Sequence, residues 1–339
     1  MSLSAIVAGA CGGTAAPVAA SASPTAARSA GAATATPQPT MQKIVVAFSE
    51  IYEGALPMWY AQEKGIFQKN FVDPDLRFIA SSTGVAALLA GEVQLFHGGG
   101  SEVVSAVAGG ADLLMVGNLV PIYPYVFMVS ANVKTLADLK GKKVGVSSPG
   151  STSDIATRVG LAKLGIDPDK DVTIVAVGSS QNRTAALLSG AIQGGLDQPP
   201  GSIVLESKGL HSLFDMASQK LPVVNNGITL QRSYVGANRP IVQRYMDSLV
   251  QSIAALRKDK PGALEVLQKQ LGEKDQKVLG ATYDYAMGLF PSQPYAKIEA
   301  FADSIRVLSA TNPKIAGFDA MKILDDSFVK SAVDRGLDK

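Results

Sequence analysis

Cysteine and histidine are nearly absent from this sequence. Cys11 is the only cysteine, and His97 and His211 are the only histidines among 339 residues. One thiol cannot form a disulfide within the chain, nor can it build a metal site that needs several cysteines. Two histidines are too few for a histidine-rich metal site. We therefore expect neither a metal nor a cofactor.

The sequence also lacks a strong net charge and the motifs of common enzymes. The formal net charge is +2 and no cluster of lysines and arginines occurs, so no nucleic-acid partner is expected. Beyond the N-terminal segment, no run of about 18 apolar residues could span a bilayer. We find no phosphate-binding glycine loop, no Gly-x-Ser-x-Gly elbow and no Ser-His-Asp set in a suitable context. These absences favour a role other than catalysis.

The N-terminal forty residues differ in composition from the rest of the chain. Residues 3–10 form a short apolar run that ends at Cys11, and this resembles a bacterial lipobox although no lysine or arginine precedes it. Residues 14–40 are almost wholly Ala, Thr, Ser, Pro and Gly, which cannot bury enough apolar surface to order themselves. We expect a signal or lipobox remnant over 1–11, with Cys11 as the lipid anchor, and a disordered tether over 12–40. The alternative is an unstructured N-terminus with an incidental cysteine.

The remaining chain contains the same order of elements twice. Each unit reads strand, helix, strand, helix, strand, and each carries an Ala-Ala-Leu-Leu-x-Gly hexad, at 86–91 and at 185–190. Alternating strands and helices predict mostly parallel sheets with right-handed crossovers. The predicted strands are 43–49, 76–80 and 93–96 in the first unit, and 143–147, 172–177 and a short strand reaching 196–199 in the second.

Two such units predict an α/β fold with two lobes, each a doubly wound, mostly parallel sheet. Ligands bind beyond the carboxyl ends of the strands in such sheets, so two facing edges would form one cleft. The extended apolar segments 123–130 and 222–230 are candidate crossovers that together form a hinge. Helices are predicted over 241–256, 262–271, 275–290 and 297–309, and we expect them to cover the first lobe. We assign residues 41–128 and 226–339 to lobe 1 and residues 129–225 to lobe 2.

Three stretches, at 59–67, 87–93 and 133–146, resemble the periplasmic binding proteins of the sulfonate, taurine and nitrate ABC importers. That superfamily also includes binders of thiamine-pathway pyrimidines and of riboflavin. The resemblance covers about residues 43 to 260 and implies a type II periplasmic-binding fold. It also implies a monomeric, extracytoplasmic solute-binding protein whose partners are a small organic solute and the permease subunits. Gln193-Gly194-Gly195 departs from the Asp-Ala pair that relatives often carry, which weakens any transfer of substrate identity. The alternative is an enzyme on the same fold, of the pyrimidine or menaquinone pathway type.

Hydroxyl residues at predicted helix starts are the first candidates for ligand binding. Ser151-Thr152-Ser153 follows Pro149-Gly150 and opens a helix, whose unpaired N–H groups favour an anion. The alternative is an ordinary helix cap, with Ser151 and Asp154 spaced as in a capping box. Capping is equally the alternative for the other two helix starts. The candidates from these helix starts are Ser81, Ser82, Thr83, Gly99, Gly100, Ser101, Ser151, Thr152 and Ser153.

Further candidates follow the predicted strands. Arg183 either clamps a sulfonate or carboxylate or is a solvated helix residue. Glu50 and Asp197 suit an amine or a ring nitrogen better than an anion. A packing role is favoured for Trp59, Tyr60 and His97. A sulfonate-like anion is the first expectation for the solute; a pyrimidine, a thiamine precursor or riboflavin is the second. The candidates from strand ends and the following segments are Ser49, Glu50, Tyr52, Arg183, Asp197 and Gln198.

Overall fold

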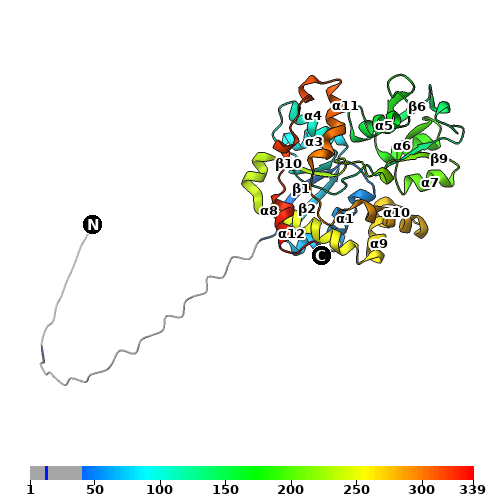
Figure 1. Cartoon of the computed structure of the whole chain (residues 1–339). Coiled ribbons are helices and arrows are strands. Elements are labelled where there is room, and N and C mark those ends of the chain that lie inside the picture. The colour runs from blue at the N-terminus through cyan, green and yellow to red at the C-terminus, as the bar shows by residue number, and fades with distance from the viewer. Residues whose placement is uncertain (1–11, 14–39) are drawn as a thin grey trace, which may run out of the picture. The chain divides into compact units, whose positions relative to one another are not determined.

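A computed structural model describes residues 12–13 and 40–339 of the chain (Figure 1). The predicted lipid anchor at Cys11, the signal remnant and all but the ends of the predicted tether lie outside the described residues. From Thr40 to Lys339 the chain forms one compact unit. No helix among the residues described is long and apolar enough to cross a membrane.

The first sheet has five strands in the order β2-β1-β3-β10-β4. Strands β2 and β3 pair parallel with β1, whereas β10 is antiparallel to both of its neighbours. Four strands therefore run in one direction. The single reversed strand is β10, which follows the strands of the second sheet in the sequence. The bounds are β1 Gln42–Phe48, β2 Val72–Phe78, β3 Leu95–Gly98, β4 Leu113–Asn118 and β10 Gly227–Gln231.

The second sheet repeats this arrangement in the order β7-β6-β8-β5-β9. Here β5 is the reversed strand between β8 and β9. The identical order confirms the predicted two-lobed α/β fold and explains the duplicated pattern of the sequence. The bounds are β5 Val126–Val129, β6 Lys143–Val146, β7 Thr173–Ala176, β8 Gly194–Asp197 and β9 His211–Asp215.

Two antiparallel segments connect the lobes. The backbone N–H of Tyr123 donates to Leu221 O at 3.3 Å, and that of Val223 donates to Pro121 O at 3.0 Å. Each segment leads into the reversed strand of the lobe that it enters, β5 in one direction and β10 in the other. The predicted boundary after residue 128 falls within β5. The division of the chain into lobes stays a prediction.

Helices flank both sheets, as Figure 1 shows. In each lobe the helix after the second strand begins with serine, Ser81 in α3 and Ser180 in α6. Strand β1 is buried on both faces: Ile44 and Val46 belong to one apolar core and Ala47 to another, as expected for a parallel strand. The bounds are α1 Leu56–Glu63, α2 Ile66–Lys69, α3 Ser81–Ala90, α4 Gly100–Ala108, α5 Thr152–Lys163, α6 Ser180–Leu188 and α7 Gly201–Ser207.

The C-terminal part is helical, as predicted. Helix α8 consists of two helical segments joined at a kink, where Asn238 leaves the helical region at φ −131° and ψ 27°. The predicted helix over 241–256 corresponds to the second segment, with Pro240 in its first turn, and the first segment, which begins at Arg232, was not predicted. Helix α11 also contacts α5 of the second lobe. The bounds are α8 Arg232–Leu256, α9 Lys260–Leu271, α10 Gln276–Leu289, α11 Ala302–Ser309 and α12 Ser327–Asp334.

Candidate functional site

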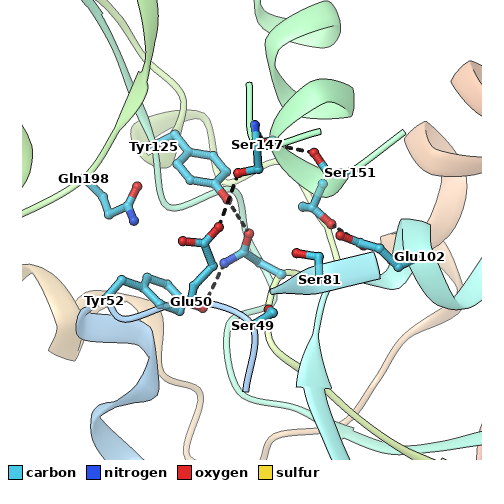
Figure 2. A pocket seen from close by; sticks show the side chains of 13 residues that line it. Ser49, Glu50, Tyr52, Ser81, Glu102, Tyr125, Ser147, Ser151 and Gln198 are labelled. Atoms are coloured by element: carbon cyan, nitrogen blue, oxygen red, sulfur yellow. Dashed lines mark hydrogen bonds between the residues drawn. The ribbon is translucent and has the colours of Figure 1, made fainter. Parts of the chain in front are cut away.

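A polar cavity lies where the strand ends of both lobes meet, and Figure 2 shows its lining side chains. It measures about 340 Å³ when its open mouth is included, but its interior admits only about one water molecule. The lining residues are Ser49, Glu50, Tyr52, Ser81, Gly99, Glu102, Tyr125, Ser147, Ser151, Thr152, Ser153, Gln198 and Asn225.

Glu50 follows β1 and joins the lobes through its carboxylate. Its Oε2 accepts hydrogen bonds from the Ser180 hydroxyl at 2.9 Å and from the Ser180 backbone N–H at 3.2 Å. Its Oε1 accepts one from the Ser147 hydroxyl at 3.3 Å. Ser180 is the first residue of α6, so the Glu50 carboxylate occupies the N-terminus of that helix and is favoured there by the helix dipole.

A second carboxyl from the first lobe, Glu102 in α4, faces the start of α5. The Thr152 hydroxyl donates to Glu102 Oε2 at 3.3 Å, and the Ser101 hydroxyl donates to the same oxygen at 2.7 Å. Burial raises the pKa of Glu102, and hydrogen bonds from Ser101, Thr152 and Ser81 counteract that shift in part. Glu102 was not among the sequence candidates, because a carboxyl in the first turn of a helix is commonly a solvated charge.

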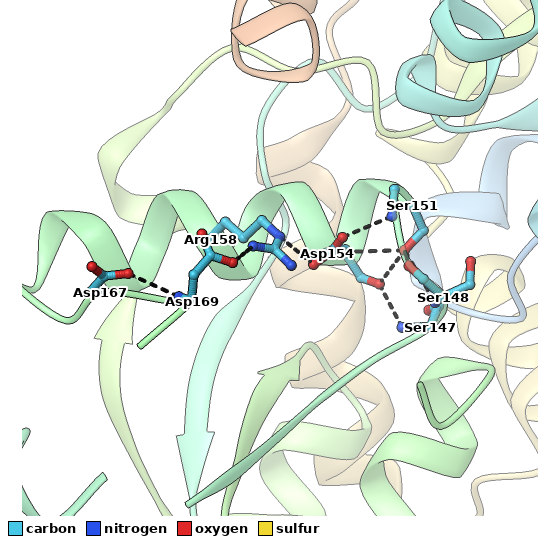
Figure 3. A network of polar contacts seen from close by, with 9 residues as sticks. Ser147, Ser148, Ser151, Asp154, Arg158, Asp167 and Asp169 are labelled. Atoms are coloured by element: carbon cyan, nitrogen blue, oxygen red, sulfur yellow. Dashed lines mark hydrogen bonds and ion pairs between the residues drawn. The ribbon is translucent and has the colours of Figure 1, made fainter. Parts of the chain in front are cut away.

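The start of α5 is a capped helix end, and Figure 3 shows its polar network. The Ser151 hydroxyl accepts a hydrogen bond from the backbone N–H of Asp154, as the capping interpretation predicted. The Asp154 carboxylate does not complete a capping box; it accepts from the Gly150 backbone N–H at 2.8 Å and from Arg158 Nε at 2.8 Å. Ser153 Oγ accepts from the Ser147 backbone N–H at 2.9 Å. The hydroxyl groups of Ser151 and Ser153 are therefore already hydrogen-bonded to the backbone of this loop and helix start.

The two crossovers place Tyr125 and Asn225 in the cavity wall. The Tyr125 hydroxyl donates to Asn225 Oδ1 at 2.9 Å, and Asn225 Nδ2 donates to the Tyr52 hydroxyl at 3.0 Å. Burial raises the pKa of both tyrosines, so both hydroxyls keep their protons at neutral pH. The sequence predicted the crossovers but did not reveal that they carry lining side chains. The only available signal was a polar side chain within each extended segment.

Asp197 and Gln198 end β8 and are buried. The Asp197 carboxylate accepts from the Thr184 hydroxyl at 2.6 Å and from the Gln198 backbone N–H at 2.8 Å. Burial raises the pKa of Asp197 to about 6, against the opposing influence of Arg183. Among the residues that the structure describes, nothing hydrogen-bonds to the buried Gln198 Oε1.

Arg183 is 1% exposed, so the prediction of a solvated helix residue was wrong. Its Nε donates to the Leu196 carbonyl and its Nη1 donates to the Ser147 hydroxyl at 3.2 Å. The side chain thus lies behind β8 rather than among the cavity-lining residues. The buried guanidinium offsets one carboxylate charge at this edge of the sheet.

The remaining predicted residues occupy different places around the cavity, and Gly99 is the one that lines it. Ser82 lines an adjoining hollow, together with Ser49 and Ser81. Thr83 is exposed and lines none of these hollows. Gly99 lies so close to Thr152 and Glu102 of the opposing walls that a Cβ at this position would collide with both. Gly100 has no such role, because it packs on Val224 and Phe301 behind the site.

The packing predictions for the aromatic residues and for His97 are confirmed. Trp59 and Tyr60 are 2% and 4% exposed and belong to the first apolar core. His97 is 2% exposed and is hydrogen-bonded to Asn226 at 3.1 Å and to the Tyr245 hydroxyl at 2.8 Å. Burial lowers the pKa of His97 to about 4, so the imidazole is neutral at physiological pH.

One buried carboxyl next to the site was missed entirely. Glu53 is 0% exposed, and neither of its carboxyl oxygens has a hydrogen-bond partner within the described part of the chain. Burial raises its pKa well above the usual range, and the nearby carboxylates of Asp197 and Glu50 raise it further. Residues 12–13 and 40–339 contain no group of three or more His, Cys, Asp or Glu side chains that could hold a metal ion.

The sequence is similar to a family model and to several known proteins. A family model described as NMT1/THI5 like matches residues 54–261, which is more than half of the chain. A Haemophilus influenzae protein named for thiamine biosynthesis is 35% identical over 135 residues, 39% of this chain and 42% of its own length. A protein of Brucella abortus named as a binding protein is 34% identical over 116 residues, 34% of this chain and 35% of its own length. The matched part thus spans less than half of either relative.

Solved structures extend the likeness across both lobes. The alkanesulfonate-binding protein SsuA from Xanthomonas axonopodis pv. citri, bound to MOPS, superposes with a TM-score of 0.66 at 21% identity. The superposition covers 88% of this chain and 99% of that one. At this identity the comparison shows the shared fold, that of a periplasmic binding protein with two lobes.

Proposed function

Because the chain belongs to the NMT1/THI5-like family, we propose that it is the solute-binding component of an ABC importer. In this role it captures a small organic solute outside the cytoplasm and delivers it to the permease subunits. The observation that carries the proposal is the cavity whose walls come from both lobes, with Ser49 and Glu50 on one side and Ser147 and Ser151 on the other. The names of its relatives, a binding protein and an alkanesulfonate-binding protein, support the same role.

The size of the cavity implies how the solute enters. The innermost cavity has room for about one water molecule, so an organic solute can enter it only when the lobes separate, whereas the adjoining hollows beside Ser82 and beside Gln198 are larger. The hydrogen bonds from Glu50 to Ser147 and Ser180 have to break during that separation. The two crossover segments are the natural hinge, because they alone carry the backbone between the sheets. Closing the lobes again would bury the solute and present the permease with a distinct shape.

The chemistry of the cavity supports binding rather than catalysis. Its lining groups, in the part of the chain described, are hydroxyls, carboxyls and amides, and they include no histidine, cysteine or lysine. A serine nucleophile needs a neighbouring base such as an imidazole to remove its proton. Ser147 in the lining and Ser180 beside it donate to the Glu50 carboxylate of the opposite lobe instead, which is an arrangement for holding the lobes together.

We further propose that Cys11 carries the lipid anchor and that the protein acts as a monomer at the membrane surface. This rests on the lipobox-like run before Cys11 and on the Ala/Thr/Ser/Pro-rich segment after it. Expression of the full chain with Cys11→Ala tests the anchor. The variant is expected in the soluble extracytoplasmic fraction, and a variant that stays in the membrane fraction contradicts the proposal. Light scattering of purified protein tests the monomer.

Binding and closure can be tested together on the full chain. Thermal-shift measurements against sulfonates, taurine, nitrate, pyrimidines, thiamine and riboflavin identify a stabilising class. A solute at 100 times its dissociation constant adds about 2.7 kcal/mol to stability. Small-angle X-ray scattering with and without that solute then measures the change in shape. An unchanged scattering profile at saturation contradicts closure around the solute.

A further inference from the structure

The charges around the cavity point to the class of solute, and this inference rests on the proposed binding role. Glu50 and Glu102 line the cavity, Gln198 lies beside Asp197, and Glu53 is buried close to Glu50 and Asp197. The lining residues in the described chain include no lysine, arginine or histidine. We propose that the solute is an organic nitrogen cation, an ammonium or amidinium group on a small carbon skeleton.

Within the described residues, Arg183 is the guanidinium that acts on these carboxyls. It lowers the pKa of Asp197, while its Nε donates to the Leu196 carbonyl and its Nη1 donates to the Ser147 hydroxyl. One positive charge cannot balance Glu50 and Asp197 together, whereas burial favours the uncharged forms of Glu102 and Glu53, which therefore add little further negative charge. A cation entering the cavity would supply the missing positive charge in a region where water screens little.

The helix starts that suggested an anion are partly occupied by the protein's own carboxyl groups. Glu50 takes the N–H and hydroxyl of Ser180 at the start of α6, and Glu102 takes the Thr152 hydroxyl at the start of α5. A sulfonate placed here would displace these contacts and lie against Glu50. An ammonium or amidinium group would instead add hydrogen bonds to carboxylate oxygens that already face the cavity.

An unpartnered acceptor gives independent support. Gln198 is 4% exposed, lines the cavity, and has no partner for its Oε1 within residues 12–13 and 40–339. A buried acceptor without a donor is costly, so a solute that brings an N–H group restores a lost hydrogen bond. The side chain extends toward the cavity in Figure 2. Tyr52 and Tyr125 also line the cavity, and aromatic rings attract cations over their faces.

Probes of similar carbon skeleton and opposite charge test the proposal on the full chain. Isothermal titration compares benzamidinium with benzenesulfonate, and propylammonium with propanesulfonate, against the wild type and Glu50→Gln. We expect at least one cation to bind and neither sulfonate to do so. In Glu50→Gln the cation affinity should fall about 30-fold or more, because a buried carboxylate partner is lost. Glu92→Gln, on the exposed turn after α3, is the matched control and should bind like the wild type.

The direction of the Glu50→Gln effect separates recognition from lobe closure. If Glu50 only held the lobes together, its loss would weaken every probe that binds, whatever the charge. Binding of a sulfonate that becomes tighter in Glu50→Gln overturns the cation proposal and leaves the solute-binding role intact. Failure of both cations to bind also overturns it. If, in addition, no solute in the thermal-shift panel stabilises the protein, the proposed function fails with it.

Discussion

The carboxylate of Glu50 in the first lobe accepts two hydrogen bonds from Ser180 in the second lobe, one from its hydroxyl at 2.9 Å and one from its backbone N–H at 3.2 Å. The residues lie 130 positions apart in the chain and meet only when the lobes are together. The contact joins the end of β1 to the start of α6. It therefore contributes directly to the stability of the closed arrangement.

Ser180→Ala removes the hydroxyl donor but keeps the backbone N–H. We expect the closed arrangement to lose about 1.5–3 kcal/mol, the usual contribution of a hydrogen bond to a charged group, and solute affinity to fall by roughly tenfold or more. Small-angle scattering of the free protein should show a larger radius of gyration than for the wild type. Ser189→Ala is the matched control, because the Ser189 hydroxyl only donates to the Ala186 carbonyl on the same exposed helix end. Equal scattering profiles for Ser180→Ala and the wild type would contradict the role of this contact.

Gly99→Ala tests whether the lobes need a residue without a side chain at the start of α4. An added Cβ would collide with Thr152 of the second lobe and with Glu102. We expect the variant to fold with a circular dichroism spectrum like that of the wild type but to bind solute at least tenfold more weakly, because closure is blocked.

Gly280→Ala is the control for this substitution, because nothing lies within 4 Å of the corresponding Cβ in α10. This variant should bind normally and be slightly more stable, since alanine is the better helix former. Wild-type affinity in Gly99→Ala would mean that the lobes tolerate a wider gap at this point than the structure has.

The fold could be predicted from the sequence because its signals are local and repeated. Buried parallel strands read as continuous apolar runs, and the Ala-Ala-Leu-Leu-x-Gly hexads mark corresponding helices, α3 and α6, in both lobes. Pro240 was correctly predicted to mark the start of a helical segment, because it lies in the first turn after the kink at Asn238. The short helical segment from Arg232 to the kink was not predicted.

The site was only partly predictable, for a physical reason. Residues at strand ends and helix starts, such as Ser49 and Ser151, follow from the topology of parallel sheets. Tyr125 and Asn225 lie on the crossovers, and their position depends on how two distant segments pair. Arg183 in α6 could not be placed, because burial of a guanidinium depends on acceptors such as the Leu196 carbonyl in β8. Which residues bind the solute remains a proposal.

His97 should make the protein less stable in acid. Burial lowers the pKa of His97 from about 6.5 to about 4. Between these pH values the imidazole binds a proton in the unfolded chain but stays mostly neutral in the folded chain. The stabilisation from the neutral imidazole is therefore complete above about pH 6.5 and is lost as the pH falls through 4, by about 3 kcal/mol in total. Urea unfolding at pH 7 and pH 4.5 should show a smaller loss of stability for His97→Gln than for the wild type. His211→Gln, which removes the other histidine at the half-buried start of β9, is the control. The same acid sensitivity in His97→Gln and the wild type would contradict this account.

Asp197 should act in the opposite direction over nearly the same range of pH. Its folded pKa of about 6 lies above the ordinary value of 3.8, mainly because of burial and with a contribution from Glu50, while Arg183 and the hydrogen bond from Thr184 counteract the shift. The folded chain therefore binds a proton more tightly than the unfolded chain. The resulting stabilisation is complete below about pH 3.8 and is lost as the pH rises through 6.

Asp197→Asn keeps an oxygen to accept from the Gln198 backbone N–H and removes the titration. We expect its stability relative to the wild type to increase by about 2–3 kcal/mol between pH 4 and pH 7, as measured by urea unfolding at both values. In the wild type the effects of His97 and Asp197 largely cancel between pH 4 and 6, so its own pH profile reveals neither. The two single variants should therefore deviate from the wild type with opposite slopes. Parallel profiles for the wild type and Asp197→Asn would mean that this carboxyl is already ionised in the folded protein well below pH 6.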